Sequence, residues 1–253
     1  MNILLTNDDG ISSKGIEALA TACIERGHRV LMSAPASQCS ANSQHITLTA
    51  PIVTKCMQNT DSVLSYAVYG TPADCIRIAR ELFAGEQIDF CISGVNNGEN
   101  VGSGIYYSGT VSAAREAAMM YIPSIAVSVM HGGGEKQWCA AARKAVETAE
   151  RLNGIKFPRM SVLNMNFPET DPGVWPTVRY CDLSKAFYVD KYVTCVNPNG
   201  EKYFWLGKGE NIENPQPESD LDLLRKGIPT CTLIAQYTVL NDELQEIMQN
   251  MTH

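Results

Sequence analysis

Short apolar runs and amphipathic stretches alternate along most of the chain. Residues 2–6 form an apolar run of strand length, and residues 13–26 have the spacing of an amphipathic helix. Residues 88–93 form another apolar run, of the kind found in strands that are buried on both faces of a parallel sheet. The alternation predicts an α/β fold with a mainly parallel sheet and helices on both of its faces.

The other elements follow from the same patterns, with Pro, Gly and Asn marking the breaks. We expect strands at 29–34, 122–129, 161–165 and 230–236, an antiparallel excursion at 44–49, 52–57 and 63–69, and helices at 73–84, 111–120, 137–152, 219–226 and 241–249. Aromatic residues between 187 and 205, around the turn sequence at 197–200, predict a β-hairpin. We therefore expect residues 1–171 to form the core, and residues 172–253 to add the hairpin excursion and a C-terminal strand and helix to the same domain.

Charge and composition narrow the classes of function. The 253 residues carry a net charge of -7, which argues against nucleic acid as the main partner, because a phosphate backbone needs a basic surface. No apolar run approaches the roughly 20 residues that a membrane-spanning helix requires, so we expect no membrane partner. The nine cysteines are odd in number and scattered singly, which predicts reduced thiols and a cytoplasmic location.

Three loops of unusual composition follow predicted strands. Residues 7–10 read Asn-Asp-Asp-Gly, residues 36–43 are small and polar, and residues 94–104 contain four glycines and three asparagines. In open parallel sheets, ligands bind at the carboxyl ends of the strands. We therefore expect these three loops to converge on one binding site.

Two adjacent carboxylates in the first loop suggest what that site binds. Asp8 and Asp9 are costly to bury without a positive partner, and a divalent cation such as Mg²⁺ or Mn²⁺ is the simplest one. A serine hydroxyl and an asparagine amide from the other two loops are also hard oxygen ligands, so the expected metal ligands are Asp8, Asp9, Ser40 and Asn96. The alternative is a solvated turn that caps the next helix, with Gly10 supplying an unusual backbone angle.

An anion site is expected beside the metal ion. The glycine-rich loop and the start of the helix at 108–110 offer backbone N–H donors to a phosphate group. The expected phosphate contacts are Asn97, Gly98, Ser108, Gly109 and Thr110. A metal ion next to such donors predicts hydrolysis of a phosphate ester. The alternative is that these residues form an ordinary loop and a helix cap.

At this point the chain resembles the SurE (survival protein E) family of metal-dependent nucleotidases. The matching blocks are residues 3–10, 34–35 with Ser40, 70–75, 93–96 with Gly98 and Asn100, and 107–111 with 113–114. The resemblance implies a Rossmann-like three-layer α/β/α sandwich, with Asp8, Asp9, Ser40 and Asn96 binding one divalent metal ion per subunit. It also implies hydrolysis of nucleoside 5′- and 3′-monophosphates, and homodimers or homotetramers formed through the C-terminal part.

The predicted reaction converts a nucleoside monophosphate to nucleoside and phosphate, with Asp8, Asp9 and Asn96 as catalytic residues. The pattern leaves open whether Asp8 or Asp9 also acts as a base or a nucleophile. One alternative is an aspartyl-phosphate phosphatase of the haloacid dehalogenase type, although that class needs Asp-x-Asp after its first strand. The other is a non-catalytic module that senses nucleotide and metal.

Overall fold

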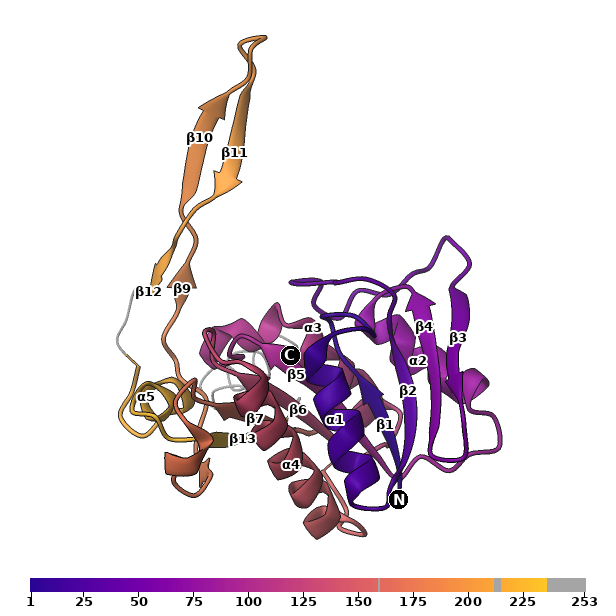
Figure 1. Ribbon diagram of the computed structural model, residues 1–253. Coiled ribbons are helices and arrows are strands. Elements are labelled where there is room, and N and C mark those ends of the chain that lie inside the picture. Colours follow the sequence, from indigo (N-terminus) through magenta and orange to yellow (C-terminus); the bar gives the residue numbers. More distant parts are fainter. Residues whose placement is uncertain (159, 212–214, 236–253) are drawn as a thin grey trace, which may run out of the picture.

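The computed structural model describes residues 1–158, 160–211 and 215–235, and these are built around one large sheet (Figure 1). Nine strands of the described part pair in the order β3-β4-β2-β1-β5-β6-β7-β13-β8. They are β1 (Asn2–Thr6), β2 (Arg29–Pro35), β3 (Val53–Asn59), β4 (Val63–Tyr69), β5 (Phe90–Asn97), β6 (Ser124–Val129), β7 (Val162–Phe167), β8 (Arg179–Tyr180) and β13 (Thr230–Ile234).

Helices cover both faces of the sheet. The helical segments are α1 (Lys14–Glu25), α2 (Pro72–Leu82), α3 (Gly109–Met119), α4 (Glu135–Leu152), α5 (Asp220–Arg225), and the 3₁₀ turns η1 (Gly102–Tyr106) and η2 (Pro172–Val174). Side chains alternate along β1, so that Ile3 and Leu5 pack with α1 and α4, and Leu4 packs with α2 and α3. Within the described ranges, no helix is both long and apolar enough to cross a membrane.

The direction of the strands brings the three unusual loops to one edge. Strands β4, β2, β1, β5, β6 and β7 run parallel, whereas β3 and β13 are antiparallel to β4 and β7. The predicted mainly parallel sheet is therefore confirmed, in a mixed form. Since parallel strands end at the same edge, the loops after β1, β2 and β5 leave the sheet side by side.

Two predicted elements differ from the structure. The strand expected at 44–49 is wrong, because this segment is a loop: the backbone N–H of Thr47 donates to Oδ1 of Asp74 (2.9 Å) and its hydroxyl to Oδ2 (2.6 Å). Strand β5 is also longer than expected, because Asn96 and Asn97 continue its pairing with β6. These two asparagines therefore belong to a strand end and not to the glycine-rich loop.

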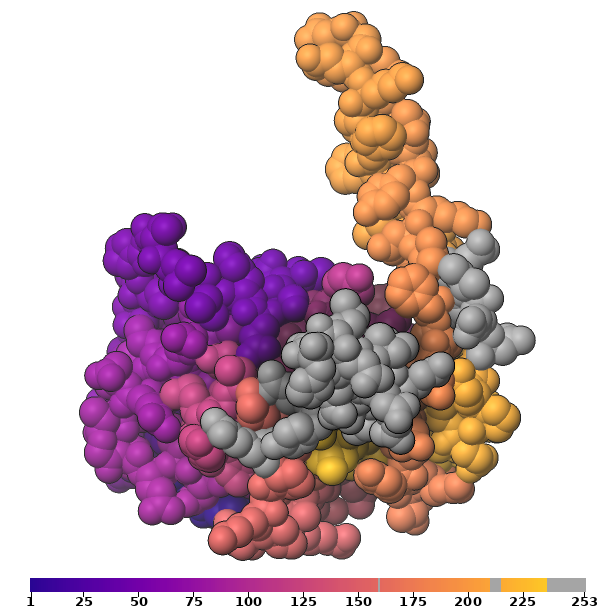
Figure 2. Space-filling view, turned by 180° about the vertical axis from the view of Figure 1, so that it is seen from behind, coloured from indigo at the N-terminus to yellow at the C-terminus, as the bar shows by residue number. Residues whose placement is uncertain are grey.

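The predicted hairpin projects far from the sheet, as both views show (Figure 1, Figure 2). It consists of β10 (Tyr192–Val196) and β11 (Lys202–Leu206), with the short pair β9 (Tyr188–Val189) and β12 (Glu210–Asn211) at its base. The helix expected at 241–249 lies outside the described residues. The division of the chain at residue 171 stays a prediction.

Candidate functional site

The turn after β1 is held by the side chain of Asn7. Its Nδ2 donates to the carbonyl oxygen of Gly10 (2.9 Å) and to the hydroxyl of Ser13 (2.7 Å), and its Oδ1 accepts from the N–H of Gly10 (3.1 Å). Ser13 in turn caps the first helix, and Gly10 has a φ of 96° that favours glycine. Asn7 therefore fixes the backbone from which Asp8 and Asp9 project. The sequence pattern assigned no role to this residue.

Asp8 lies against the start of α3. Its side chain is only 5% exposed, and Oδ1 accepts a hydrogen bond of 2.5 Å from the hydroxyl of Thr110. A Cβ added to Gly109 would lie 2.7 Å from the Cβ of Asp8, so this position admits no larger residue without a shift. The backbone oxygen of Asp8 accepts from the N–H of Cys39 (2.7 Å) in the second loop. Three distant segments thus meet at Asp8.

Asp9 faces the end of β5. Its Oδ2 lies 3.4 Å from the backbone nitrogen of Asn97, which donates a long hydrogen bond to it. Both residues line a cleft of about 260 Å³ that also receives Gln38, Lys14 and the indole of Trp138. The sequence pattern pointed to neither Gln38 nor Trp138, because no motif marks residues that meet only through the packing of α4 beside the loops.

The other two expected metal ligands, Ser40 and Asn96, are the sequence neighbours of Cys39 and Asn97, which contact Asp8 and Asp9. Ser40 follows Cys39, is exposed, and accepts a hydrogen bond from Nε2 of Gln38 (3.0 Å). Asn96 precedes Asn97, and its Nδ2 donates to the carbonyl oxygen of Gly98 (2.7 Å). Because that amide nitrogen is engaged, the oxygen of Asn96 is the atom left for a ligand. The loops that carry all four residues converge as expected, while their joint role as metal ligands stays a prediction.

Removal from water disfavours the ionised forms of the Asp8 and Asp9 carboxylates. Burial raises the pKa of Asp8 from 3.8 to about 6, against the hydrogen bond from Thr110 that lowers it, and the charge of Asp9 raises it further. Burial also raises the pKa of Asp9, and the N–H of Asn97 lowers it. No cationic side chain in the described part of the chain contributes to either value.

A divalent cation fits this pair of carboxylates. A buried anion and a half-buried anion beside it that lack a positive partner are stabilised most simply by an ion that both can bind. Among the described residues, no three His, Cys, Asp or Glu side chains cluster as a metal site, so carboxylates alone do not complete one. The hydroxyl of Ser40, next to Cys39, and the amide oxygen of Asn96, next to Asn97, are the neutral oxygen donors that the sequence predicts to complete the site.

The expected phosphate contacts lie around the same turn. Ser108 is the N-cap of α3, and its hydroxyl accepts from the N–H of Val111 (3.1 Å), which leaves its proton free to be donated. Thr110 donates to Asp8, while Gly98 lies beside the amide of Asn96. Their contact with a phosphate group stays a prediction.

Asp74, in a block shared with the SurE family, has a structural role. Burial raises its pKa, but the hydrogen bonds from Thr47 and Thr71 outweigh this effect and hold the pKa below 3.8. It forms a capping box with Thr71 at the start of α2, and it holds the loop at Thr47. The neighbouring Cys75 is fully buried. A carboxylate in the first turn of a helix typically caps that helix, and a buried thiol typically packs in the core, so both residues have structural roles.

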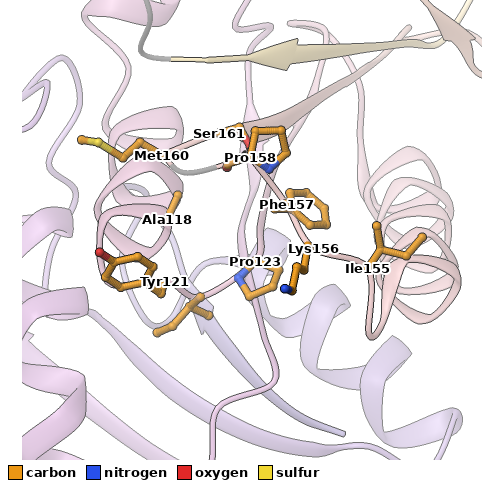
Figure 3. Close-up of a pocket in the computed structure, with 10 residues that line it drawn as sticks. Ala118, Tyr121, Pro123, Ile155, Lys156, Phe157, Pro158, Met160 and Ser161 are labelled. Carbon is orange, nitrogen blue, oxygen red and sulfur yellow. Dashed lines mark hydrogen bonds between the residues drawn. The ribbon is translucent and has the colours of Figure 1, made fainter.

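A separate cavity of about 310 Å³ lies at the opposite edge of the sheet (Figure 3). Most of its lining comes from residues 121–123, which precede β6, and from residues 155–158 and 160–161, which precede β7, so it is at the amino ends of these strands. Tyr121, Pro123 and Phe157 give it an apolar wall. It shares no residue with the Asp8 and Asp9 site and lacks the carboxylates that such chemistry needs.

The close approach of Gly109 to Asp8 gives a direct test of the site. In Gly109→Ala, the added methyl group would lie 2.9 Å from Oδ2 of Asp8 and would displace the carboxylate. We expect kcat for phosphate release to fall about a hundredfold, the cost of misplacing a reacting group by about 1 Å. Gly104→Ala is the control, since a Cβ there meets nothing within 4 Å. Equal activities of the two variants would contradict the placement of Asp8 in the site.

Comparison with known proteins identifies the family of the chain. The sequence profile of the family described as Survival protein SurE matches residues 3–190 of the chain. This protein belongs to the SurE family.

Its relatives are similar along nearly the whole chain. The protein named 5′-nucleotidase SurE from Desulfovibrio desulfuricans is 38% identical over 236 residues, which cover 92% of this chain and 91% of that protein. The 5′-nucleotidase SurE of Clostridium botulinum is 36% identical over 247 residues, 97% of each chain. The crystal structure of the SurE protein from Aquifex aeolicus superposes with a TM-score of 0.81 at 26% identity and covers 100% of both chains. The described fold is thus that of a SurE protein.

Proposed function

We propose that this protein is a metal-dependent 5′-nucleotidase, which hydrolyses nucleoside 5′-monophosphates, and 3′-monophosphates as a second substrate class, to nucleoside and phosphate. The proposal rests on one observation above the others: of two adjacent carboxylates, Asp8 is buried against the N-terminus of α3 and Asp9 is half-buried beside it, and neither has a cationic partner among the described residues. The names of its relatives, 5′-nucleotidase SurE, support the same activity.

The residues of the chain would divide the work as follows. Asp8, Asp9, Ser40 and Asn96 would hold one divalent cation such as Mg²⁺ or Mn²⁺, which supplies positive charge for the phosphoryl oxygens and acidifies a water molecule. Thr110 holds Asp8 in place by its hydroxyl. The backbone N–H groups at the start of α3 would orient the phosphate group, because a helix N-terminus favours an anion. The N–H groups of Asn97 and Gly98 already donate to Asp9 and to the carbonyl oxygen of Val129.

The cleft beside Asp9 supports a substrate larger than phosphate. It has a volume of about 260 Å³ and is lined by Gln38, Asn97 and the indole of Trp138. Its position next to the carboxylates allows one part of a bound molecule to reach the cleft while its phosphate lies at the metal ligands. The aromatic wall and the amides suit a heterocyclic base, which stacks and forms hydrogen bonds.

Release of phosphate from a panel of substrates tests the proposal. The purified protein with Mn²⁺ or Mg²⁺ is expected to release phosphate from AMP and the other 5′-monophosphates, and more slowly from 3′-monophosphates. Chelation by EDTA should remove the activity, and adding the metal ion back should restore it, because the carboxylates need their cation. Activity that persists in EDTA, or binding of AMP without phosphate release, would contradict it.

The proposal extends to assembly and location. The hairpin exposes a row of large apolar side chains, of which Tyr192, Phe204 and Trp205 are more than 60% exposed. Such a surface is typical of contacts between proteins, so we propose a homodimer or homotetramer that is formed through the hairpin and the C-terminal part. The nine cysteines are all unpaired, which supports a reducing compartment, the cytoplasm.

A further inference from the structure

The loop that links β5 to α3 is held by buried polar side chains from β7 and α5. Residues 98–101 belong to no helix or strand, and η1 follows at Gly102. The two ends of this link carry the expected ligand residues, Asn96 and Asn97 before it and residues 108–110 after it. Contacts that hold this link in one conformation therefore also fix the distance between Asn96 and Asn97 on one side and residues 108–110 on the other.

The first clamp acts on Asn100 and comes from β7. The backbone N–H of Asn100 donates to Oδ1 of Asn166 (2.8 Å), and its carbonyl oxygen accepts from Nδ2 of the same residue (3.1 Å). Asn164 donates a further hydrogen bond to that carbonyl (2.7 Å), and the side chain of Asn100 donates to Ser128 (2.9 Å). Asn164 and Asn166 are fully buried. In the absence of water, each of these hydrogen bonds is costly to break.

The second clamp acts on Gly102 and comes from Asp220, the first residue of α5. Its carboxylate is fully buried, and Oδ2 accepts from the N–H of Gly102 (3.0 Å). Oδ1 accepts from the N–H groups of Ser184 and Leu221, both at 2.7 Å. One buried carboxylate thus joins the loop to the segment that leads into the hairpin, although Asp220 and Gly102 lie more than a hundred residues apart in sequence.

The fit around Gly102 is close. Its φ is 50°, and an added Cβ would lie 3.1 Å from the carbonyl oxygen of Ser184. Burial raises the pKa of Asp220, and its three backbone hydrogen bonds lower it. No cationic side chain of the described residues appears among the causes of that shift. The three backbone N–H groups that donate to Asp220 therefore offset the cost of burying its charge. One of them belongs to Gly102, so this compensation requires the loop to stay in place.

We propose that Asp220 and Asn166 are positioning residues of the phosphoryl site. They hold the 98–107 link rigid, so that the side chains of Asn96 and Asn97 at one end and the N–H donors of α3 at the other are in place before substrate binds. Donors that are fixed in advance lose less entropy and need less reorganisation when the phosphate group arrives. The inference rests on the proposed function, because it names which residues outside the site shape its affinity for phosphate.

Asp220→Asn is the main test, with Asp222→Asn as the matched control. The amide nitrogen of the new side chain would face an N–H group of Gly102 or Ser184, so one hydrogen bond becomes a repulsive contact. Asp222 lies on the same helix and is partly exposed, and among the described residues its carboxylate bonds to the backbone of Glu218 and the side chain of Lys226. We expect KM for AMP and the inhibition constant for inorganic phosphate to rise about tenfold in Asp220→Asn, and to stay within twofold in the control.

Measuring KM and the inhibition constant distinguishes a positioning role of Asp220 from a role in folding alone. A partly unfolded preparation has less active enzyme, which lowers kcat but leaves KM and the inhibition constant unchanged. An unchanged pair of constants would therefore overturn the inference, even if kcat fell. Asn166→Ser removes two hydrogen bonds from Asn100 without touching Asp220, and it should shift both constants in the same direction.

Amide hydrogen exchange tests the inference without turnover. In the metal-free protein, Asp220→Asn should speed exchange at residues 98–104 at least tenfold, while exchange in β1 and β6 stays as in the unsubstituted protein. Unchanged exchange in the loop would overturn the inference. If the unsubstituted protein released no phosphate, the proposed function would fail by itself. The dissociation constant for inorganic phosphate with Mn²⁺, measured by calorimetry, would then replace KM, and an equal value in both proteins would overturn the positioning role.

Discussion

Replacing Asp9 with Asn is expected to lower kcat for phosphate release from AMP by about a hundredfold to a thousandfold. The amide keeps the shape of the side chain and can still accept from the N–H of Asn97, but it removes one negative charge and one of the oxygens available to a cation. The rate falls because the charge that develops on the phosphoryl group is less well stabilised. Removing one stabilising group from such a site lowers the rate by about 10²–10³. Free phosphate after incubation with Mn²⁺ is the measurement.

Asp61→Asn is the matched control for this substitution. Asp61 lies exposed in the turn between β3 and β4, far from the edge that carries the candidate site. The same chemical change there should leave kcat within twofold, and both variants should show the circular dichroism spectrum of the unsubstituted protein. An Asp9→Asn variant with more than a fifth of the normal activity would exclude Asp9 from the reaction.

The order of strands and helices could be predicted because each buried strand has a recognisable apolar run. Residues 2–6 and 88–93 are short apolar runs, and the helices between them carry one apolar face. The segment 44–49 misled the prediction, because its alternation imitates a strand while its hydrogen bonds go to Asp74. An acceptor 27 residues away along the chain leaves no periodic signal.

The candidate site could be placed from the sequence for a similar reason. Parallel strands end at one edge, so the loops after β1, β2 and β5 had to converge, and the contacts of Asp8 with Thr110 and Cys39 show this. The support around the site was not visible in the sequence. Asn7 looks like one more polar residue of a turn, and Asp220 looks like a helix cap, until the fold brings Gly102 to it.

The buried charge of Asp8 links the site to the stability of the fold. Since its pKa is about 6 in the folded protein and 3.8 for an unperturbed aspartate, the folded protein binds its proton more tightly between these two values. Ionised Asp8 therefore destabilises the metal-free fold above about pH 6, and its contribution to stability improves as the pH falls towards 4. A shift of this size corresponds to about 3 kcal/mol at most, so the binding of a cation would stabilise the site at neutral pH.

Asp8→Asn is accordingly expected to abolish phosphate release and at the same time to stabilise the metal-free protein. Asparagine can still accept the hydrogen bond from Thr110 but carries no charge to bury. At about pH 7.5 in EDTA, the midpoint of thermal unfolding should rise by about 5 °C, which corresponds to about 1–3 kcal/mol for a chain of this length. At about pH 4 the difference should nearly vanish, because Asp8 is then protonated in the unsubstituted protein.

Saturating Mn²⁺ should reverse the order of the two proteins, because a ligand that binds only the folded state at about 1,000 times its dissociation constant adds about 4.1 kcal/mol. The unsubstituted protein would gain this stabilisation and Asp8→Asn would not. Asp74→Asn serves as the contrasting control, since the pKa of Asp74 lies below 3.8 and its carboxylate accepts three hydrogen bonds from Thr47 and Thr71. Its replacement should lower the midpoint with or without Mn²⁺. If Asp8→Asn also lowered the midpoint in EDTA, the carboxylate would be part of the scaffold, and the unpaired charge would not be what prepares the site for a cation.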